Sequence, residues 1–358
     1  MPSLPPSNIS LTYSSPSSTP HLTYLPLKDP ASNQLIIKVR YAAINPCDIQ
    51  LWHSTLVGWA RFGREGTMGW DYSGTIAAVG DSLKGKWEVG DEVLGLCDGP
   101  AAQGTFTKYL TISDKAPIAR KPKGWTLAEA AAVPLVTLTA FACLDRLPPA
   151  KPFIAHRRVV VSGASGGTGM WCVQLAKKVY DCHVTAICSG QNADFVRELG
   201  ADEVIDYTTP NVPQALVNHC SGGLKFDMFI DCVGGTGMFG IWREIIQKEG
   251  TYITIVGDKT SRTVSGPPLT YFTYPAQVLR HCLGWVFGPR YAAVILYDES
   301  KYLEQVTRLT DKNEVKVVVQ EIIEGILEEG SEKEAWERAS TLLEQGRIRG
   351  KVVLKVQK

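Results

Sequence analysis

Several features that would place the chain in a particular class of protein are missing from its 358 residues. The nine cysteines are odd in number and form no C-x-x-C pair, so neither a disulfide framework nor a common zinc-binding spacing is indicated. The six histidines are scattered, and none forms an H-x-x-x-H pair. The sequence therefore predicts reduced thiols and no bound metal.

An excess of either charge is also missing, since 37 Lys and Arg residues stand against 36 Asp and Glu residues, a net charge of +1. No run of about 18 uncharged apolar residues occurs. The nearest candidate, 271–297, is interrupted by Arg280, His281 and Arg290. The N-terminus, rich in Ser, Pro and Thr, has no basic or apolar targeting region. We expect a cytoplasmic protein with no nucleic-acid partner and no integral membrane span.

The order of secondary-structure patterns predicts two domains. Up to residue 125 the chain reads as short strands broken by Gly and Pro, which indicates a β-rich domain. Thr126 and Glu129 then form a capping box that begins a helix. Strands and helices alternate from 158 onward, which predicts a doubly wound parallel sheet within a domain spanning 126–297. The stretch 298–358 has a weaker pattern and is expected to return to the first domain.

These patterns also give the bounds of individual elements. Strands are predicted at 35–42, 74–79, 92–96, 105–112, 159–161, 183–188, 204–205, 226–233, 251–256, 315–320 and 351–356. Helices are predicted at 127–132, 137–144, 170–179, 193–199, 299–309 and 332–343.

The most informative motif is a glycine-rich turn. Gly163, Gly166 and Gly169 follow the apolar strand 159–161 and precede the helix 170–179. Such glycines let the backbone turn sharply and approach a pyrophosphate, which the free N–H groups at a helix N-terminus then bind. The spacing is G-x-x-G-x-x-G rather than G-x-G-x-x-G, so a purely structural turn remains the alternative. No G-x-S-x-G motif and no P-loop lysine supports a hydrolase or a kinase.

The end of the second strand bears on the choice of dinucleotide. NAD-binding domains usually place Asp or Glu there to hold the ribose 2′-hydroxyl. This chain has no acid from Ile187 to Asn192, and Ser189 can donate a hydrogen bond to a 2′-phosphate, with Tyr207 as a second donor. The sequence therefore predicts NADPH. Possible cationic partners are Lys177, Lys178 and Arg197, although a solvated position on a helix face is the favoured interpretation for each.

With these motifs the chain resembles the zinc-independent, quinone oxidoreductase-like branch of the medium-chain dehydrogenase/reductase family, and within it the reticulon-interacting protein group. The resemblance runs from about Leu35 to Val356. The matching segments, in chain order, are 43–48, 68–71, 90–93, 131–139, 163–169, 185–189, 199–202, 204–207, 231–235 and 350–351. It implies a GroES-like domain built from both chain ends and a Rossmann domain, with the active site in the cleft between them.

The resemblance also implies site residues. Asn45 and Trp70 stand where zinc-dependent relatives bind the metal, and neither is a credible zinc ligand. The resemblance implies a set of positions that would contact NADPH, to which we add Thr137. The full set is Thr137, Ser165, Gly166, Gly167, Thr168, Gly169, Ser189, Tyr207, Cys232 and Thr254. Cys232 replaces an Asn that is frequent in relatives, and Gln191 and Asn192 replace a frequent Lys.

The implied reaction is hydride transfer from NADPH to a quinone or an α,β-unsaturated carbonyl compound. Asn45 is the candidate donor to the substrate oxygen, with an ordinary turn position before Pro46 as the alternative. Asp48 is a candidate catalytic residue, although bracing of the loop is the favoured interpretation. Thr137 and Thr139 are candidates to orient the nicotinamide, with helix packing as the alternative. Weaker candidates for a proton donor are Trp52, His53 and Tyr72.

Two other interpretations stay open: a nucleotide-binding scaffold or regulatory protein with little turnover, and a dedicated enoyl reductase of a biosynthetic pathway. The apolar segment 271–287 contains Phe272, Tyr274, Trp285 and Phe287. Four roles are compatible with it: the lining of a substrate pocket, a homodimer face, a part of the core, or a contact with a membrane surface. The sequence does not choose among these.

Overall fold

The computed structural model describes residues 4–55, 65–99, 102–150, 156–209, 211–261, 263, 274–312 and 314–357. The chain divides into two compact units. The first unit comprises Met1–Leu135, Arg262–Val264 and Asp298–Lys358, and the second comprises Val136–Ser261 and Ser265–Tyr297. The first unit therefore extends past Thr126, where the sequence analysis placed the beginning of the second domain.

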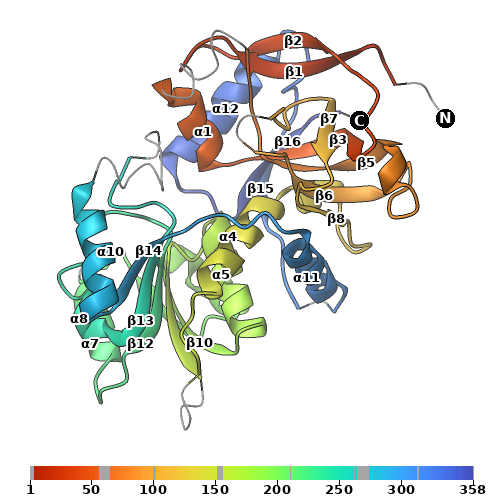
Figure 1. Ribbon diagram of the computed structural model, residues 1–358. Helices are drawn as coiled ribbons and strands as arrows, with labels where there is room; N and C mark the ends of the chain where they lie inside the picture. Colours follow the sequence, from red (N-terminus) through yellow and green to blue (C-terminus); the bar gives the residue numbers. More distant parts are fainter. Residues whose placement is uncertain are drawn as a thin grey trace. The chain divides into compact units, whose positions relative to one another are not determined.

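The first unit is built around a seven-stranded sheet in the order β15-β16-β3-β5-β6-β8, with β7 paired to β3. Its strands are β3 (Gln34–Ile44), β5 (Asp71–Val79), β6 (Glu92–Leu96), β7 (Tyr109–Ser113), β8 (Ile118–Arg120), β15 (Val319–Ile323) and β16 (Lys351–Lys355). The C-terminal strand β16 runs antiparallel to β3 and places Val352 opposite Ile44. Both ends of the chain thus contribute to one sheet, which is visible in Figure 1 as blue beside orange.

A smaller sheet and several helices also belong to the described part of the first unit. The small sheet contains β1 (Ser7–Tyr13), β2 (His21–Pro26) and β4 (Gly66–Thr67). The helices are α1 (Pro46–His53), α3 (Leu127–Ala131), α11 (Ser300–Asp311) and α12 (Glu332–Gln345), with a short 3-10 turn, η1 (Asp81–Leu83). Alternating side chains of the strands and the inner faces of α1 and α12 form one core, in which Trp52 meets Trp336 edge to face at 5.1 Å.

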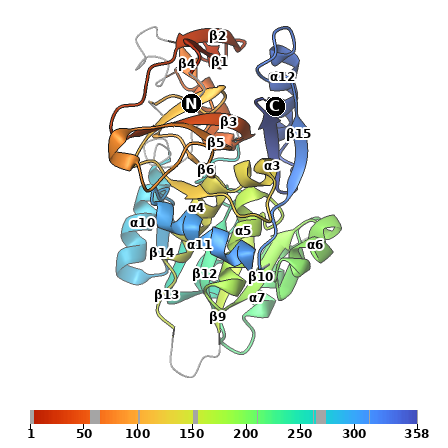
Figure 2. The ribbon, with the colours of Figure 1, turned by 90° about the vertical axis from the view of Figure 1, so that its right-hand side faces the viewer.

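The second unit is a six-stranded, wholly parallel sheet in the order β11-β10-β9-β12-β13-β14. Its strands are β9 (Arg157–Ser162), β10 (Cys182–Cys188), β11 (Glu203–Asp206), β12 (Phe226–Asp231), β13 (Ile246–Thr254) and β14 (Arg290–Ala293). A parallel sheet needs helical crossovers, and these cover it and bury the strands. The predicted doubly wound α/β architecture is therefore confirmed (Figure 2).

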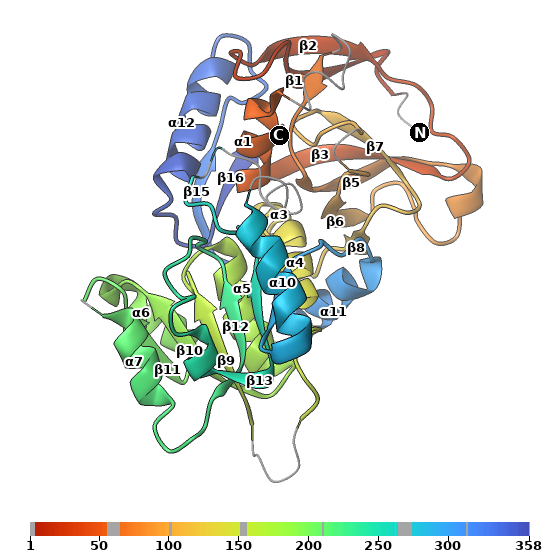
Figure 3. The ribbon, with the colours of Figure 1, turned by 60° about the vertical axis from the view of Figure 1, so that its left-hand side comes forward.

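The crossover helices pack on particular strands. They are α5 (Gly167–Lys178), η2 (Gly190–Asn192), α6 (Ala193–Glu198), α7 (Val212–His219), α8 (Trp242–Ile245) and α10 (Pro275–Phe287), and α4 (Pro134–Leu144) precedes them. Helix α5 contacts β9 and β10 (Figure 3), and α10 contacts β14. Leu216 of α7 and Trp242 of α8 join one core with Val160, Phe229 and Tyr252 of the strands.

Some elements differ from the sequence analysis. The strand predicted at 315–320 lies further along, at β15, because pairing with β16 begins only at Val319, while Val317 packs on a separate cluster. Helices α7 and α10 and the strands β1, β2 and β14 were not predicted. Their apolar periods are short, so packing rather than local pattern determines them.

The apolar segment 271–287 is only partly described. Phe272 lies outside the described residues. Trp285 and Phe287 belong to α10 and expose 67% and 61% of their surfaces, so neither is a core residue. Among the helices that the structure describes, none has the length and apolar character needed to cross a bilayer.

Candidate functional site

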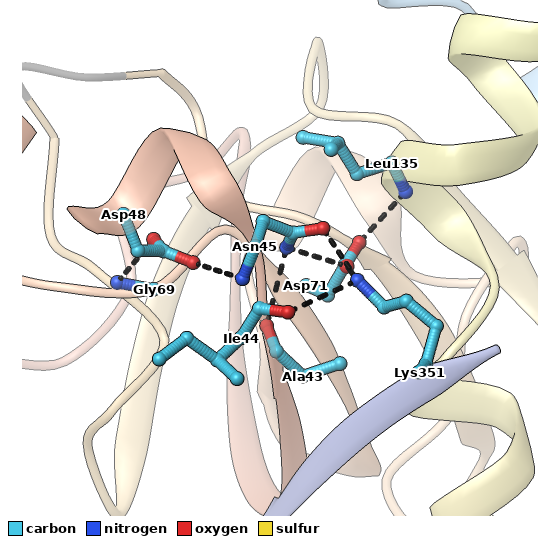
Figure 4. A network of polar contacts seen from close by, with 8 residues as sticks. All are labelled: Ala43, Ile44, Asn45, Asp48, Gly69, Asp71, Leu135 and Lys351. Atoms are coloured by element: carbon cyan, nitrogen blue, oxygen red, sulfur yellow. Dashed lines mark hydrogen bonds and ion pairs between the residues drawn. The ribbon is translucent and has the colours of Figure 1, made fainter. Parts of the chain in front are cut away.

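Three polar side chains meet in the interior of the first unit. Asn45 lies between β3 and α1, Asp71 begins β5 and Lys351 begins β16, and all three are almost wholly buried. Asn45 Nδ2 donates to Asp71 Oδ2 at 2.9 Å and to Ala43 O at 3.2 Å. Figure 4 shows these groups pointing toward one another from three elements far apart in the sequence.

Lys351 supplies the positive charge of this network. Its Nζ donates to Asn45 Oδ1, to Asp71 Oδ2 at 3.1 Å and to Ile44 O at 3.3 Å. The second oxygen of Asp71 accepts a hydrogen bond from Leu135 N at 2.7 Å. A buried ion pair is tolerated only when its remaining donors and acceptors are satisfied, and here they are. Asn45 was predicted to donate a hydrogen bond to the substrate. Both of its amide hydrogens are instead donated to groups of the protein.

Asp48 braces the loop beside this network. Its Oδ2 accepts from Asn45 N at 2.8 Å, and its Oδ1 accepts from Gly69 N at 3.1 Å. The carboxyl group therefore links the first turn of α1 to the segment before β5. Burial raises the pKa of Asp48 to about 7, with the nearby Asp71 adding to the effect and the two backbone donors opposing it. This geometry agrees with the alternative that Asp48 braces the loop.

A cavity of about 20 Å³ lies beside Asp48, Trp70 and Cys97. That space admits roughly one water molecule. Trp70 occupies the position where the resemblance placed a zinc ligand, and its indole packs against the core.

Of the weaker proton-donor candidates, Trp52 and His53 make hydrogen bonds within the protein, whereas the buried Tyr72 hydroxyl has no hydrogen-bond partner among the described residues. Trp52 Nε1 donates to Ser18 O at 2.9 Å, and His53 Nδ1 lies 2.7 Å from Ser17 Oγ. Tyr72 is fully buried within β5, and desolvation raises the pKa of its phenol well above the usual value. Sequence position alone did not reveal that these groups face the interior or the N-terminal segment.

In the second unit the glycine-rich turn joins β9 to α5. Gly163 has φ +71°, a conformation that glycine adopts without strain. A Cβ on Gly169 would lie 2.1 Å from Gly163 O, so only glycine lets the helix pack this closely on the turn. The helix begins after Gly166, which caps it without a side chain, so the N–H groups of Gly167, Thr168 and Gly169 lack partners within the helix. The turn is thus shaped as an anion-binding cradle.

Asn192 connects this cradle to the end of the neighbouring strand. Its Nδ2 donates to Ser165 Oγ and to Ser189 Oγ, both at 3.2 Å. Ser165 and Ser189 were predicted as separate contacts. In the structure both hydroxyl groups accept hydrogen bonds from the same Asn192 amide. The sequence analysis noted Asn192 only as the replacement of a frequent lysine, and the amide's two donors were the signal that could have identified its role.

The charges near Ser189 include two surface ion pairs and one further acid. The predicted cationic partners are paired on their own surfaces, Lys177 with Asp202 at 2.6 Å and Arg197 with Asp194 at 2.9 Å. Asp206, at the end of β11, lies against Gly190, where its Oδ2 would be 2.4 Å from an added Cβ. Hydrogen bonds from the backbone and hydroxyl of Thr208 lower the pKa of Asp206, so this carboxylate stays charged close to Ser189.

Tyr207, the other predicted donor, lies directly after β11. Its side chain is 59% exposed, and its backbone N donates to Cys188 O at 3.1 Å, which fixes it beside the end of β10. Tyr207 is therefore an exposed residue whose backbone lies next to the end of β10.

Cys232 and Thr254 follow the next strands at the same edge of the sheet. Thr254 is paired in register with Asp231, and Asp231 with Ser162, so these strand ends are neighbours. Thr254 Oγ1 donates to Asp231 Oδ2 at 3.1 Å and accepts from Gly257 N at 2.8 Å. Asp231 Oδ1 also accepts from the backbone N–H groups of the next loop at 2.9 and 3.0 Å. Asp231, which the sequence analysis did not select, therefore holds the loops that follow β12 and β13.

The remaining predicted contacts lie on α4. Thr137 is fully buried and Thr139 is 7% exposed. Burial on this helix is compatible with either alternative, so a role of Thr137 and Thr139 in orienting the nicotinamide stays a prediction.

No three His, Cys, Asp or Glu side chains converge in a way that would hold a metal ion, as far as the described ranges extend. Asn45 contacts Lys351 instead, and the ammonium group already provides a cation at that point.

With this geometry in hand, comparisons with known proteins identify the class of protein. Residues 31–123 match the model of the alcohol dehydrogenase GroES-like domain, and residues 199–354 match that of a zinc-binding dehydrogenase. The chain is 31% identical over 351 residues to "NAD(P)H oxidoreductase RTN4IP1, mitochondrial" of Mus musculus, covering 90% of this chain and 82% of that protein. The chain therefore belongs to the medium-chain dehydrogenase/reductase family of oxidoreductases, as the motifs predicted.

Other similar proteins add detail. "Trans-enoyl reductase pgmF" of Aspergillus terreus is 29% identical over 343 residues, covering 92% of this chain and 90% of that protein. A chloroplast envelope quinone oxidoreductase homolog of Arabidopsis thaliana is 26% identical, covering 82% of this chain and 84% of that protein. The solved quinone oxidoreductase of Coxiella burnetii has the same fold, with a TM-score of 0.76, 22% identity, and coverage of 98% of this chain and 100% of that one.

We expect Lys351→Met to destabilise the protein by about 3–5 kcal/mol, because it leaves the buried Asp71 carboxylate without its cation. Lys355→Met on the same strand is the matched control: Lys355 pairs with the exposed Glu324, and an exposed pair contributes about 0–1 kcal/mol. Urea denaturation of both variants measures the difference. Equal losses of stability would contradict the assignment of Lys351 as the counter-ion of Asp71.

Asp48 predicts a pH dependence of stability. Its pKa is about 7 in the folded protein and about 3.9 in an unfolded chain. The folded state therefore binds the proton more tightly, so the stabilisation is complete below pH about 4 and is lost as pH rises through about 7. Between pH 5 and pH 8 the protein should lose about 2–3 kcal/mol that Asp48→Asn does not lose. Denaturant titration at both pH values tests this, with the exposed Asp29→Asn as control, and the same slope in all three proteins would contradict it.

Proposed function

We propose that the protein is an NADPH-dependent, zinc-independent oxidoreductase that transfers hydride to a quinone or an α,β-unsaturated carbonyl compound. One observation carries the proposal: the glycine-rich turn and the N-terminus of α5 form a cradle that Asn192 ties to Ser189. A diphosphate fits the cradle and a further phosphate fits the serine. NADPH, when bound, supplies a hydride to an electron-poor carbon.

The cradle suits a diphosphate because its donors are mostly backbone groups. The close contact of Gly169 with Gly163 leaves no side chain between the helix N-terminus and an approaching anion. The N–H groups of Gly167, Thr168 and Gly169 and the hydroxyl groups of Ser165 and Thr168 would hold the diphosphate. The positive end of the α5 dipole adds favourable electrostatics.

NADPH rather than NADH is favoured by the donors that follow β10. Ser189 and Tyr207 carry hydroxyl groups where NAD-binding relatives of this fold carry an acid, and the Asn192 amide donates to the Ser189 hydroxyl oxygen, which leaves the Ser189 hydrogen for a phosphate. Asp206 lies nearby and opposes the binding of a phosphate. Its lone pairs are turned toward Thr208 N at 2.9 Å and Thr208 Oγ1 at 2.8 Å, which compensates part of its charge.

Zinc independence is supported by the network around Asn45. The Lys351 ammonium group contacts both Asn45 and Asp71, and a metal ion at Asn45 would be repelled by it. Asn45, Trp70 and Cys97 also offer no set of ligands with the preferences of zinc.

The substrate class follows the names of similar proteins, which include a quinone oxidoreductase homolog and a trans-enoyl reductase. Both kinds of substrate carry an electron-poor carbon conjugated to an oxygen. A dedicated enoyl reductase is the narrower form of the same proposal. The cytoplasmic location and a homodimer stay predictions.

A nucleotide-binding protein with little turnover is the second candidate. It is favoured by the burial of Asn45 and Asp48, which expose only 1% of their surfaces and bind groups of the protein itself. In the enzyme, by contrast, the hydride acceptor takes its proton from water or from a group not yet identified.

The decisive assay follows NADPH oxidation at 340 nm with a panel of enones, enals and quinones. We expect acceptor-dependent oxidation by the protein and a preference for NADPH over NADH. Ser189→Asp should lower the ratio of kcat/KM for NADPH to that for NADH by about tenfold or more, because the new carboxylate repels the 2′-phosphate.

Ser221→Asp, in an exposed turn of the same unit, is the control and should leave the ratio unchanged. Saturable binding of NADPH without its oxidation by any acceptor would contradict the enzyme proposal and would support the nucleotide-binding scaffold. An unchanged ratio in Ser189→Asp would contradict the assignment of Ser189 to the 2′-phosphate.

A further inference from the structure

A serine, a histidine and a glutamate meet at the surface of the first unit, and no step of the proposed hydride transfer uses them. Ser17 lies in the loop between β1 and β2, His53 is the last residue of α1, and Glu344 lies near the end of α12. Ser17 Oγ is 2.7 Å from His53 Nδ1, and His53 Nε2 is 3.7 Å from Glu344 Oε1. The imidazole therefore lies between a hydroxyl and a carboxylate, as it does in sites of nucleophilic catalysis.

Ser17 occupies a turn position at which glycine is the usual residue. Ser18 N donates to Ser15 O at 3.0 Å, so residues 15–18 form a turn in which Pro16 is second and Ser17 is third. The φ angle of Ser17 is +63°, a conformation that a side chain disfavours. Backbone strain of this kind persists only where surrounding contacts impose it, and it gathers at functional residues.

Contacts with α1 hold this turn in place. Ser17 N donates to Trp52 O at 3.0 Å, and Trp52 Nε1 donates to Ser18 O at 2.9 Å. The Trp52 ring lies 4.5 Å from the imidazole of His53, and it meets Trp336 of α12 edge to face. The hydroxyl and the imidazole are therefore positioned by the surrounding protein and not only by their own hydrogen bond.

The charges around His53 favour its action as a base. Nδ1 can accept the proton of Ser17 only in the tautomer that carries hydrogen on Nε2. Nε2 is enclosed by protein and, within the part of the chain that the structure describes, has no hydrogen-bond partner. Because Glu344 at 3.7 Å is beyond hydrogen-bonding distance, its carboxylate acts through its charge, as does the negative end of the α1 dipole. Both stabilise the imidazolium that forms when His53 takes a proton.

The nucleophile is reachable from solvent. Ser17 is exposed, and the side chains of His53 and Glu344 expose 27% and 43% of their surfaces. A hydroxyl at the surface can meet an acyl group without the opening of a lid. Activated esters need little further help from the protein, since their leaving group departs as a stable anion. They are therefore the substrate class that this arrangement can take.

We propose that this group is an acyl-transfer site that hydrolyses small activated esters. Ser17 is the nucleophile, His53 is the general base, and Glu344 is a positioning residue that acts through His53. The inference goes beyond hydride transfer and involves no nucleotide, so its test is independent of the proposed function.

The reaction balances in two steps. The Ser17 oxygen attacks the acyl carbon, His53 Nδ1 takes the hydroxyl proton, and the C–O bond to the leaving group breaks, so that an alcohol departs with the proton. A water molecule then attacks the acyl-serine and gives its proton to His53, and the C–O bond to Ser17 breaks. The products are a carboxylic acid and the restored serine, and nothing is oxidised or reduced.

Hydrolysis of p-nitrophenyl acetate by the full-length protein tests the proposal. The release of p-nitrophenolate is followed by absorbance, and acetylated residues are mapped by peptide mass spectrometry after an acid quench. We expect an acetyl group on Ser17, formed at a rate that His53→Gln lowers about a hundredfold. The rate should also fall at acidic pH, where an imidazole is protonated.

Matched variants separate the site from neighbouring groups. His21→Gln is the control for His53→Gln, because His21 also lies beside an acid, at 3.5 Å from Glu65. Ser15→Ala is the control for Ser17→Ala, because the turn uses the backbone N and O of Ser15. Neither control should change the rate of Ser17 acetylation or of hydrolysis. Glu344→Gln should lower kcat and leave KM unchanged, and Glu344→Asp should restore part of kcat.

Ser17→Gly distinguishes a lost nucleophile from a lost fold. Glycine adopts a φ of +63° without strain, so this variant should keep the Tm of the unmodified protein while acetylation in the turn disappears. Acetylation confined to lysine or cysteine residues would overturn the proposal. So would equal rates of Ser17 acetylation in the unmodified protein and in His53→Gln, or hydrolysis that Ser17→Gly and Ser17→Ala leave unchanged.

Discussion

The contact between the Gly163 carbonyl and Gly169 is the constraint on which the nucleotide site depends. It holds the first turn of α5 directly against the end of β9, so that backbone donors rather than side chains face the open edge of the sheet. The adjoining parts of the site are placed by register with β9. Ile187 of β10 and Asp231 of β12 lie beside Ser162, and their loops therefore end next to the turn. A parallel sheet concentrates such loops at one edge, which is where ligands bind in this architecture.

The first unit contributes a second polar centre of a different kind. Asn45, Asp71 and Lys351 come from three separate elements, and their mutual bonds fasten the C-terminal strand β16 to the interior. Each of the three side chains is hydrogen-bonded to the other two. The network therefore fixes the structure at a position where zinc-dependent relatives hold a metal, and it leaves no free amide for a substrate.

The doubly wound sheet, the capping box at Thr126 and the glycine-rich turn were predictable, since each depends on local pattern. The return of the C-terminus to the first unit was also anticipated, although β15 lies a few residues beyond its expected position. The polar network was not predictable as a site. Lys351 and Asp71 are 280 residues apart, and nothing in either segment shows that they meet. The bridging role of Asn192 and the pairing of Lys177 with Asp202 likewise depend on tertiary geometry, whereas the pair of Arg197 and Asp194 lies within one helix at a spacing of three residues.

The central claim is that the backbone around Gly163 and Gly169 holds the diphosphate of NADPH. Calorimetric titration of the full-length protein with NADPH tests it most directly, with Gly169→Ala and Gly240→Ala compared under conditions where both are folded. A Cβ at Gly169 meets Gly163 O at 2.1 Å, whereas one at Gly240 meets nothing within 4 Å. We predict saturable binding that Gly240→Ala retains and Gly169→Ala loses. No binding by the unmodified protein, or equal binding by both variants, would contradict the account.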